Sequence, residues 1–200
     1  MIVIMTEIYN QKYFHARNGF WRLMRKWFLF PKVFKLTNPE EKDIILEIGC
    51  ERGDFVRALS PYSQKVIGID INKEIIEKTG SKNLIYMSAE KLEFPSSSFD
   101  KIVSCHTIEH LPDLKKVFSE IERVLKSGGK CILVYPLELI RGFSALRDAW
   151  LAFRNPFLAS KIHLHRLWPN KLKKFTQMKI IKKGILFSPS LDFYTILQKE

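Results

Sequence analysis

Short apolar runs alternate with helix-like patterns through the middle of the chain. Turn residues flank each run, as is typical of strands that are covered on both faces of a sheet. The runs are DIILEIG, KVIGIDI, NLIYM, FDKIVSC and KCILVYP. The clearest helix pattern, residues 113–129, lies between the last two, with Asp113 as a candidate N-cap and Gly128 as a candidate C-cap. This alternation predicts an α/β fold with a mostly parallel sheet.

The two ends of the chain have a different pattern. Residues 15–30 (HARNGFWRLMRKWFLF) predict a basic amphipathic helix with Phe20, Met24, Trp27 and Phe28 on one side. Residues 138–157 predict a second aromatic and basic helical stretch after the fifth apolar run. The last thirty residues predict a short helix and then two strands, which would form a hairpin at a sheet edge.

These patterns divide one domain into four parts. We expect a helical cap over residues 1–42, a cofactor-binding core over 43–136, a helical insertion or lid over 137–177, and a strand pair over 178–200. Two hundred residues are enough for one such domain. No segment has the composition of a signal peptide or of a membrane-spanning helix, so we expect a cytoplasmic protein. The cysteines Cys50, Cys105 and Cys131 lack metal-ligand spacing and are expected to be buried free thiols.

The net charge of +12 is unevenly distributed along the chain. Lys and Arg outnumber Asp and Glu by eight to three in residues 1–42 and by twelve to three in residues 141–200. Between them, residues 43–140 carry thirteen basic and fifteen acidic side chains. The basic ends therefore indicate contact with something anionic, although a solvated lysine-rich surface remains open for any single cluster.

A glycine turn follows the first apolar run, in the stretch ILEIGCERGDF (residues 45–55). A strand that stops at glycine and turns directly into a helix usually holds a nucleotide-like ligand. Glu51 stands where a dinucleotide-binding loop has its second glycine, and no Gly-Lys-Ser/Thr follows. Asp70 ends the second run, where a carboxylate commonly accepts hydrogen bonds from both hydroxyls of a ribose.

Five stretches in this order resemble the class I S-adenosylmethionine-dependent methyltransferases, in particular their small-molecule, type 11-like branch. The stretches are LEIGCERG, VIGIDIN, MSAEKLEFPSSSFDKIVS, HTIEHLPD and LKSGGKCILVYP. The resemblance implies a Rossmann-like, doubly wound, seven-stranded sheet whose last strand is antiparallel, together with a helical lid. It also implies S-adenosylmethionine as the cofactor.

The resemblance assigns roles to matching residues. It implies that Glu47 lies near the methionyl ammonium and that Cys105 or His106 lies beside the rest of the methionine part. It implies that Asp70 and Ile71 contact the ribose and that Ala89 and Glu90 lie beside the adenine. The loop residues that would lie against the cofactor are Gly49, Cys50 and Gly53. Two positions depart from the family. Glu51 replaces a usual glycine, which requires the turn to keep a negative φ there. Ser88 replaces a frequent aspartate, which removes a contact with the adenine amino group.

The expected reaction is an in-line displacement, in which an oxygen, nitrogen or carbon nucleophile attacks the sulfonium methyl group. His106 is the first candidate for a general base, followed by His110 and Tyr135, and a packing role stays open for all three. The aromatic, basic ends favour a small-molecule or lipid-like acceptor that carries negative charge. Residues 14–30 are a candidate contact with an anionic membrane surface.

Other interpretations of the same residues stay open. The pattern His106-Thr107-Ile108-Glu109-His110 matches HxxEH zinc peptidases, but it straddles a strand end rather than lying on a helix. It also resembles the place where some quinone O-methyltransferases of this superfamily bind a divalent metal through carboxylates and a histidine, although this chain keeps Glu109 and His110 and has His106 at the other position. A metal therefore stays open as an alternative, but none is predicted, and His110 is expected to pack the next turn. The basic flanks would also suit RNA, although nucleic acid is disfavoured because the aromatics have helical spacing. A third alternative is a non-catalytic binding module. His163 and His165 are either near the acceptor or packed. The oligomeric state is not indicated.

Overall fold

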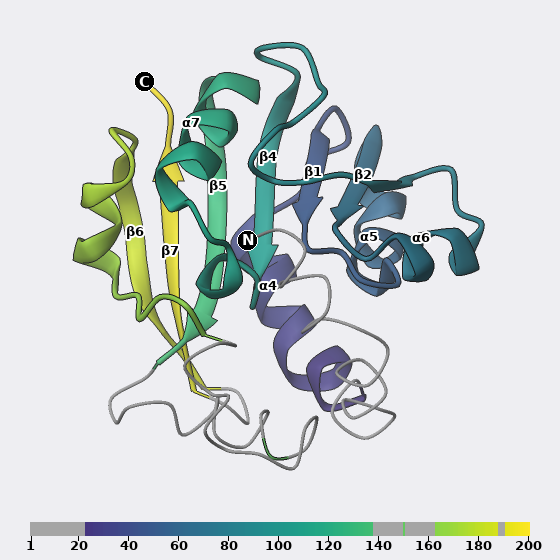
Figure 1. Ribbon diagram of the computed structural model, residues 1–200, viewed down its shortest axis with the longest axis horizontal. Helices are drawn as coiled ribbons and strands as arrows, with labels where there is room; N and C mark the ends of the chain where they lie inside the picture. The colour runs from purple at the N-terminus through teal and green to yellow at the C-terminus, as the bar shows by residue number, and fades with distance from the viewer. Residues whose placement is uncertain (1–22, 138–149, 151–162, 188–190) are drawn as a thin grey trace.

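The fold is built on a seven-stranded sheet, seen in a computed structural model that describes residues 23–137, 150, 163–187 and 191–200 (Figure 1). The strand order is β3-β2-β1-β4-β5-β7-β6, and β7 runs antiparallel to both of its neighbours. The other neighbouring pairs are parallel. The strands are β1 (Ile44–Ile48), β2 (Lys65–Asp70), β3 (Leu84–Tyr86), β4 (Phe99–Cys105), β5 (Leu125–Pro136), β6 (Lys179–Leu186) and β7 (Asp192–Gln198).

Helices cover both faces of the sheet (Figure 1). The longer ones are α4 (Phe30–Thr37), α5 (Asp54–Leu59), α6 (Lys73–Thr79) and α7 (Leu114–Val124). The shorter segments are the π-helical turn η1 (Arg25–Leu29) and the 3-10 turns η2 (Ser60–Tyr62), η3 (Ile108–His110) and η5 (Pro169–Lys174).

Alternate residues of each strand enter two separate hydrophobic clusters. Leu46 and Ile102 point to the face that α7 covers, whereas Ile45 and Val103 point to the face that η1, α4, α5 and α6 cover. This division follows from the two-residue period of a strand. The predicted doubly wound α/β sheet with an antiparallel C-terminal strand is confirmed, and continuous apolar runs identified its strands because both faces are buried.

The start of α7 was predicted correctly and its end was not. The side chain of Asp113 caps the helix by accepting a hydrogen bond from the Lys116 N–H at 3.1 Å. The helix stops at Val124, however, and Leu125 is already paired with Phe99 in the sheet. Gly128 therefore lies within β5, at a φ of 74°, and not at a helix C-cap. The reason is that the chain enters the sheet at Leu125, three residues before the glycine.

The aromatic side chains predicted for one side of the N-terminal helix do not pack on the sheet in the part that the structure describes. Trp27 is 71% exposed and Phe28 is 49% exposed, while Leu29 and Val33 are buried in the core. The reason is the π-helical turn at Arg25–Leu29, whose wider winding changes which side chains face the sheet.

The predicted insertion over residues 137–177 lies mostly outside the described residues, and only Trp150 of the stretch 138–157 is described. Within the described residues, η5 takes the place of the predicted short helix before the final strands. All three cysteines are free and buried, as predicted. No helix in the described part of the chain has the length and apolar character needed to cross a bilayer.

Candidate functional site

The glycine turn lies where the carboxyl ends of the parallel strands meet. After β1 the chain folds back on β2, because the N–H groups of Gly49 and Cys50 both donate to the carbonyl oxygen of Ile69, at 2.8 and 3.0 Å. Gly53 then opens α5. The predicted strand–turn–helix unit is therefore present, and its turn adjoins the end of β2, which carries Asp70.

Two glycines in this turn are required by their surroundings. Gly49 has a φ of 81°, and a methyl group there would overlap the Thr107 side chain. Gly53 has a φ of 72°, and a methyl group there would press on Leu84. Both conformations are left-handed and favour glycine. The turn is consequently tight against β3 and against the chain that follows β4.

The expectation that Glu51 keeps a negative φ was wrong, since its φ is 47°. Glu51 adopts the left-handed conformation that a glycine would adopt without strain. Its N–H donates to Oδ2 of Asp70 at 2.9 Å, and the Asn72 N–H donates to Oδ1 of Asp70 at 2.8 Å. Asp70 therefore holds the turn in this conformation by accepting one backbone hydrogen bond from each side.

Glu47 lies at the base of this turn and is only 5% exposed. Its Oε2 atom is fully buried and has no hydrogen-bond partner among the described residues. Burial raises the pKa of Glu47 to about 8, with the neighbouring Glu51 and Asp70 adding to the rise and Arg25 opposing it. A buried carboxylate oxygen with no partner fits a cationic ligand group. Such a group would stabilise the ionised form of the carboxyl and would donate the missing hydrogen bond.

Asp70 is also buried, with 8% of its surface exposed. Burial raises its pKa to about 6, although the backbone N–H groups of Asn72 and Glu51 act against that rise. At neutral pH this carboxyl is therefore mostly ionised and able to accept hydrogen bonds. The predicted pair Glu47 and Asp70 thus stands on either side of one turn.

Arg25 is a residue of this site that the sequence analysis did not identify as functional. It lines a small pocket together with Phe30, Glu47 and the turn residues 49–52. Its Nη1 lies 3.6 Å from Oε1 of Glu51, and its guanidinium lies 6.0 Å from the centre of the Phe30 ring. The basic composition of residues 15–30 was a visible signal, but the π-helical turn that aims Arg25 into the pocket was not.

The predicted adenine side follows β3. Ala89 is buried, whereas Ile71 and Glu90 are partly exposed. The Ser88 hydroxyl accepts a hydrogen bond from the Glu90 N–H at 3.2 Å, and a Glu90 carboxylate oxygen accepts one from the Asp113 N–H at 3.3 Å. Ser88 therefore stabilises the local turn. These residues surround the same strand ends as the glycine turn.

The two cysteines near the turn are chemically inert. Burial raises the pKa of Cys105 to about 12 and raises that of Cys50 further, so both thiols stay protonated. They line the site as small apolar groups and are not nucleophiles.

His106, at the end of β4, has a φ of 55° and a side chain that is only 10% exposed. Its Nε2 lies 3.2 Å from Oδ1 of Asp192, a fully buried carboxylate at the start of β7. Its Nδ1 lies 3.7 Å from Oε1 of Glu109. Asp192 is a second residue that the sequence analysis missed, because sequence spacing does not show that β7 runs beside β5 near the end of β4.

The other two candidate bases are Tyr135 and His110. Tyr135 is completely buried, and its hydroxyl forms a hydrogen bond of 2.8 Å with the Thr195 hydroxyl, so it joins β5 to β7 within the core. His110 lies beside Glu109 and His163, with 4.9 Å between the two imidazole centres. The structure therefore groups His106 and His110 around Glu109, whereas the hydroxyl of Tyr135 is bonded to Thr195 within the core.

Known proteins are similar to this chain in sequence over its central part and in fold. A family described as a methyltransferase domain matches residues 46–133. The uncharacterized methyltransferase YcgJ of Bacillus subtilis is 37% identical over 99 residues, which cover 45% of this chain and 39% of YcgJ. The crystal structure of YcgJ has a TM-score of 0.65 at 20% identity and covers 86% of this chain and 98% of that one. Residues 46–133 therefore match the methyltransferase-domain family, which supports the predicted resemblance to the type 11-like class I S-adenosylmethionine-dependent methyltransferases.

Two further proteins are similar to this chain, one in sequence and one in fold. The ubiquinone/menaquinone biosynthesis C-methyltransferase UbiE of Wigglesworthia glossinidia brevipalpis is 31% identical over 111 residues, which cover 49% of this chain and 44% of UbiE. A geranyl diphosphate methyltransferase in complex with S-adenosylmethionine has a TM-score of 0.66 at 13% identity and covers 86% of this chain and 84% of that one. The cofactor of the family is S-adenosylmethionine. The matches with YcgJ and UbiE span less than half the length of those two relatives.

Proposed function

We propose that this methyltransferase transfers a methyl group from S-adenosylmethionine to a small-molecule or lipid-like, anionic acceptor. The observation that carries the proposal is the buried carboxylate of Glu47, whose Oε2 lacks a partner among the described residues and which lies beside the turn that Asp70 holds. A carboxylate in this position is suited to an ammonium group, and a second carboxylate at the end of β2 is suited to a pair of hydroxyls.

The chain's own residues fit each polar part of the cofactor. Glu47 would accept hydrogen bonds from the methionyl ammonium, and Asp70 and Ile71 would hold the ribose. Arg25, which already lines the pocket with Glu47, would pair with the methionyl carboxylate. Ala89 and Glu90 would lie beside the adenine. When bound, S-adenosylmethionine supplies a methyl group on a positively charged sulfur, and the protein's contribution is to align the acceptor with it.

His106 is our candidate general base. Its Nε2 is 3.2 Å from the buried Asp192 carboxylate, which would orient the imidazole and stabilise the positive charge that it acquires. An acceptor proton would be taken up at Nδ1, which lies 3.7 Å from Oε1 of Glu109. The role applies when the acceptor nucleophile is a hydroxyl or another protonated group.

The Asp70→Ala variant is expected to lose measurable affinity for S-adenosylhomocysteine, the demethylated cofactor, because it removes both the ribose contact and the two hydrogen bonds that hold the turn. Isothermal titration calorimetry of the two proteins measures the difference. Glu77→Ala is the matched control, since it removes a carboxylate that is 64% exposed on α6 and lies outside the turn. It should bind as the wild type does. A folded wild-type chain that does not bind the ligand would contradict the proposal.

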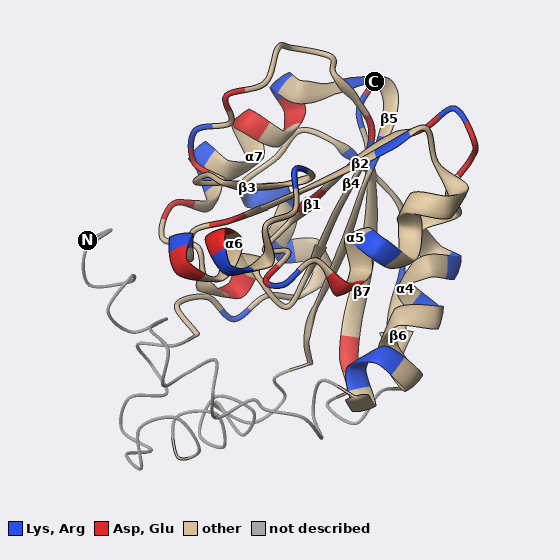
Figure 2. Cartoon of the chain, turned by 90° about the vertical axis from the view of Figure 1, so that its right-hand side faces the viewer, with Lys and Arg blue, Asp and Glu red and all other residues tan. Residues whose placement is uncertain are grey.

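The anionic character of the acceptor is inferred from the basic ends of the chain. Figure 2 shows basic positions along α4, which carries Lys32 and Lys35, and Lys26 follows Arg25 in the preceding turn. Trp27 and Phe28 are exposed beside these charges, a combination that suits the interface of an anionic membrane. Peripheral contact through residues 14–30 is therefore part of the proposal, with residues 14–22 lying outside the described part of the chain.

Trp27→Glu is expected to reduce co-sedimentation with phosphatidylserine-containing vesicles, because it replaces an exposed apolar ring with a negative charge. The fall should be about tenfold or more, since one basic residue near such a surface contributes on the order of 1 kcal/mol and the indole adds its own burial. Tyr62→Glu, an exposed aromatic on η2, is the control and should leave sedimentation unchanged. Equal sedimentation of all three proteins would remove membrane contact from the proposal.

A further inference from the structure

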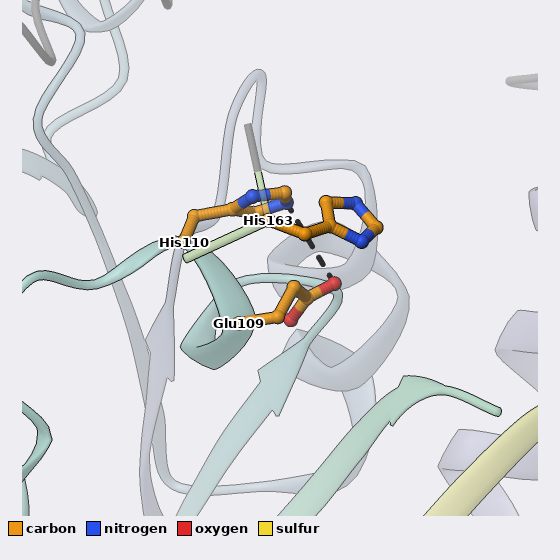
Figure 3. A group of neighbouring side chains, drawn as sticks. All are labelled: Glu109, His110 and His163. Carbon is orange, nitrogen blue, oxygen red and sulfur yellow. Dashed lines mark ion pairs between the residues drawn. The ribbon is translucent and has the colours of Figure 1, made fainter. Parts of the chain in front are cut away.

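A carboxylate and two imidazoles converge on the chain that follows β4. The ligand atoms of Glu109, His110 and His163 all lie within 4.8 Å of one another (Figure 3). Glu109 is 2% exposed and His110 is 9% exposed, whereas His163 is partly exposed, so the cluster reaches the surface on the side of His163. The Nε2 atom of His110 lies 3.7 Å from Oε1 of Glu109.

The fold itself holds the distant member of this cluster in place. The N–H groups of Leu164 and His165 both donate to the carbonyl oxygen of Glu109, at 3.0 and 3.1 Å. The Nε2 of His165 also lies 2.9 Å from the carbonyl oxygen of Leu111. Two backbone hydrogen bonds and one side-chain contact therefore dock the segment that begins at His163 onto η3 and the residue after it. These contacts keep His163 close to Glu109 and His110.

Two imidazoles and one carboxylate form a common donor set for divalent transition metals. Zinc accepts imidazole nitrogen at about 2.0–2.1 Å and carboxylate oxygen at about 2.0–2.2 Å, and three protein ligands leave a further position open on the metal. Magnesium and calcium prefer oxygen ligands, so the two histidines disfavour them. Small side-chain rotations would bring the three ligand atoms from their present separation to those that zinc requires.

We propose that Glu109, His110 and His163 bind a divalent transition metal ion, and that zinc is the preferred ion. The inference goes beyond the proposed methyl transfer and does not require it. It also differs from the expectation of no metal, which rested on His106 as the partner of His110 within HxxEH. The structure instead turns one nitrogen of His106 toward Asp192 at 3.2 Å and supplies the second imidazole from His163.

The surroundings of the cluster suit a bound cation. Glu109 is a buried carboxylate, and a divalent ion bound there would interact favourably with its negative charge. The His106 imidazole, 3.7 Å from Oε1 of Glu109, is placed to orient that carboxylate in the way that outer-shell groups orient metal ligands. The open position on the metal would accept water or an oxygen atom of an acceptor.

The test is calorimetric titration of the EDTA-treated full chain with zinc chloride, together with the absorption spectrum of the cobalt-loaded chain. The wild type should bind one zinc ion per chain. His163→Ala should weaken binding by more than the roughly 10–100-fold that loss of an outer-shell contact costs. His165→Gln is the matched control in the same segment, since glutamine can still donate to Leu111, and it should bind zinc as the wild type does.

Two results would overturn the proposal: no zinc binding by the wild type, or undiminished binding by His163→Ala. Glu109→Gln provides a second variant of nearly equal size, in case His163→Ala fails to fold, and it should also lose the cobalt spectrum. Affinity for S-adenosylhomocysteine, measured on the same proteins, separates this inference from the proposed function. Retained affinity with lost zinc binding supports both, whereas zinc binding without affinity for the cofactor supports the metal site alone.

Discussion

Lowering the pH from about 7.5 to about 6.5 is expected to weaken the binding of S-adenosylhomocysteine about tenfold, because Glu47 must be ionised to hold the ligand's ammonium group. Burial raises the pKa of Glu47 to about 8, so without ligand the carboxyl is mostly protonated across this range. Ligand binding must then remove its proton. Each pH unit below the pKa reduces the ionised fraction, and hence the apparent affinity, by about tenfold.

Glu47→Gln is the control for this prediction. Glutamine keeps the size of the side chain but has no proton to release, so the affinity of this variant should be lower at pH 7.5 and nearly constant between the two pH values. Calorimetry in two buffers of different ionisation enthalpy adds a direct measurement, since the wild type should release a proton on binding and the variant should not. A wild-type affinity that does not change with pH would contradict the burial of an un-ionised Glu47.

The stability of the ligand-free chain should change in the opposite sense. A folded-state pKa above the unfolded value means that the folded chain binds more protons. The contribution of Glu47 is therefore fully present below its ordinary pKa of 4.5 and is lost as the pH rises through about 8. The wild type should lose more stability than Glu47→Gln across this range, as measured by urea unfolding. The ionised Glu47 carboxylate that would hold a cation therefore lowers the stability of the ligand-free chain.

The sheet and the first half of the site could be predicted because they depend on local patterns. Strands buried on both faces give apolar runs, and a turn against a neighbouring element requires glycine at Gly49 and Gly53, so each leaves a sequence signal. The caps of helices are local as well, as the side chain of Asp113 shows. Gly128 was misjudged because a glycine after a helix looks the same whether it ends the helix or lies in the next strand.

The second half of the site could not be predicted because it depends on which distant segments meet. Asp192 comes to His106 through the pairing of β5 with β7, and His163 comes to His110 through backbone hydrogen bonds to Glu109. Arg25 reaches the pocket through a π-helical turn that does not follow the normal helical period. None of these contacts has a characteristic spacing, so the sequence shows the residue types without showing their neighbours.

Replacing Lys101 with methionine is expected to lower the free energy of unfolding by about 3–5 kcal/mol, the usual loss when one partner of a buried ion pair is removed. Lys101 is 5% exposed and Asp43 is 7% exposed. The Lys101 ammonium donates to Oδ2 of Asp43 at 2.6 Å and to the carbonyl oxygen of Asn38 at 2.6 Å. Without it, the Asp43 carboxylate would stay buried with no cation beside it. Urea unfolding followed by circular dichroism measures the loss.

The double variant Lys101→Met with Asp43→Asn separates the ion pair from packing. Asparagine removes the unpaired charge but can still accept the hydrogen bond that the Glu40 N–H donates to Asp43 at 2.6 Å. The double variant should therefore recover a large part of the loss, whereas a loss that remains unchanged would assign the effect to the lysine stem. Because the pair joins β4 to the turn between α4 and β1, it also fixes the helix that follows Arg25. Lys101→Met should for this reason weaken S-adenosylhomocysteine binding even under conditions where the variant remains folded.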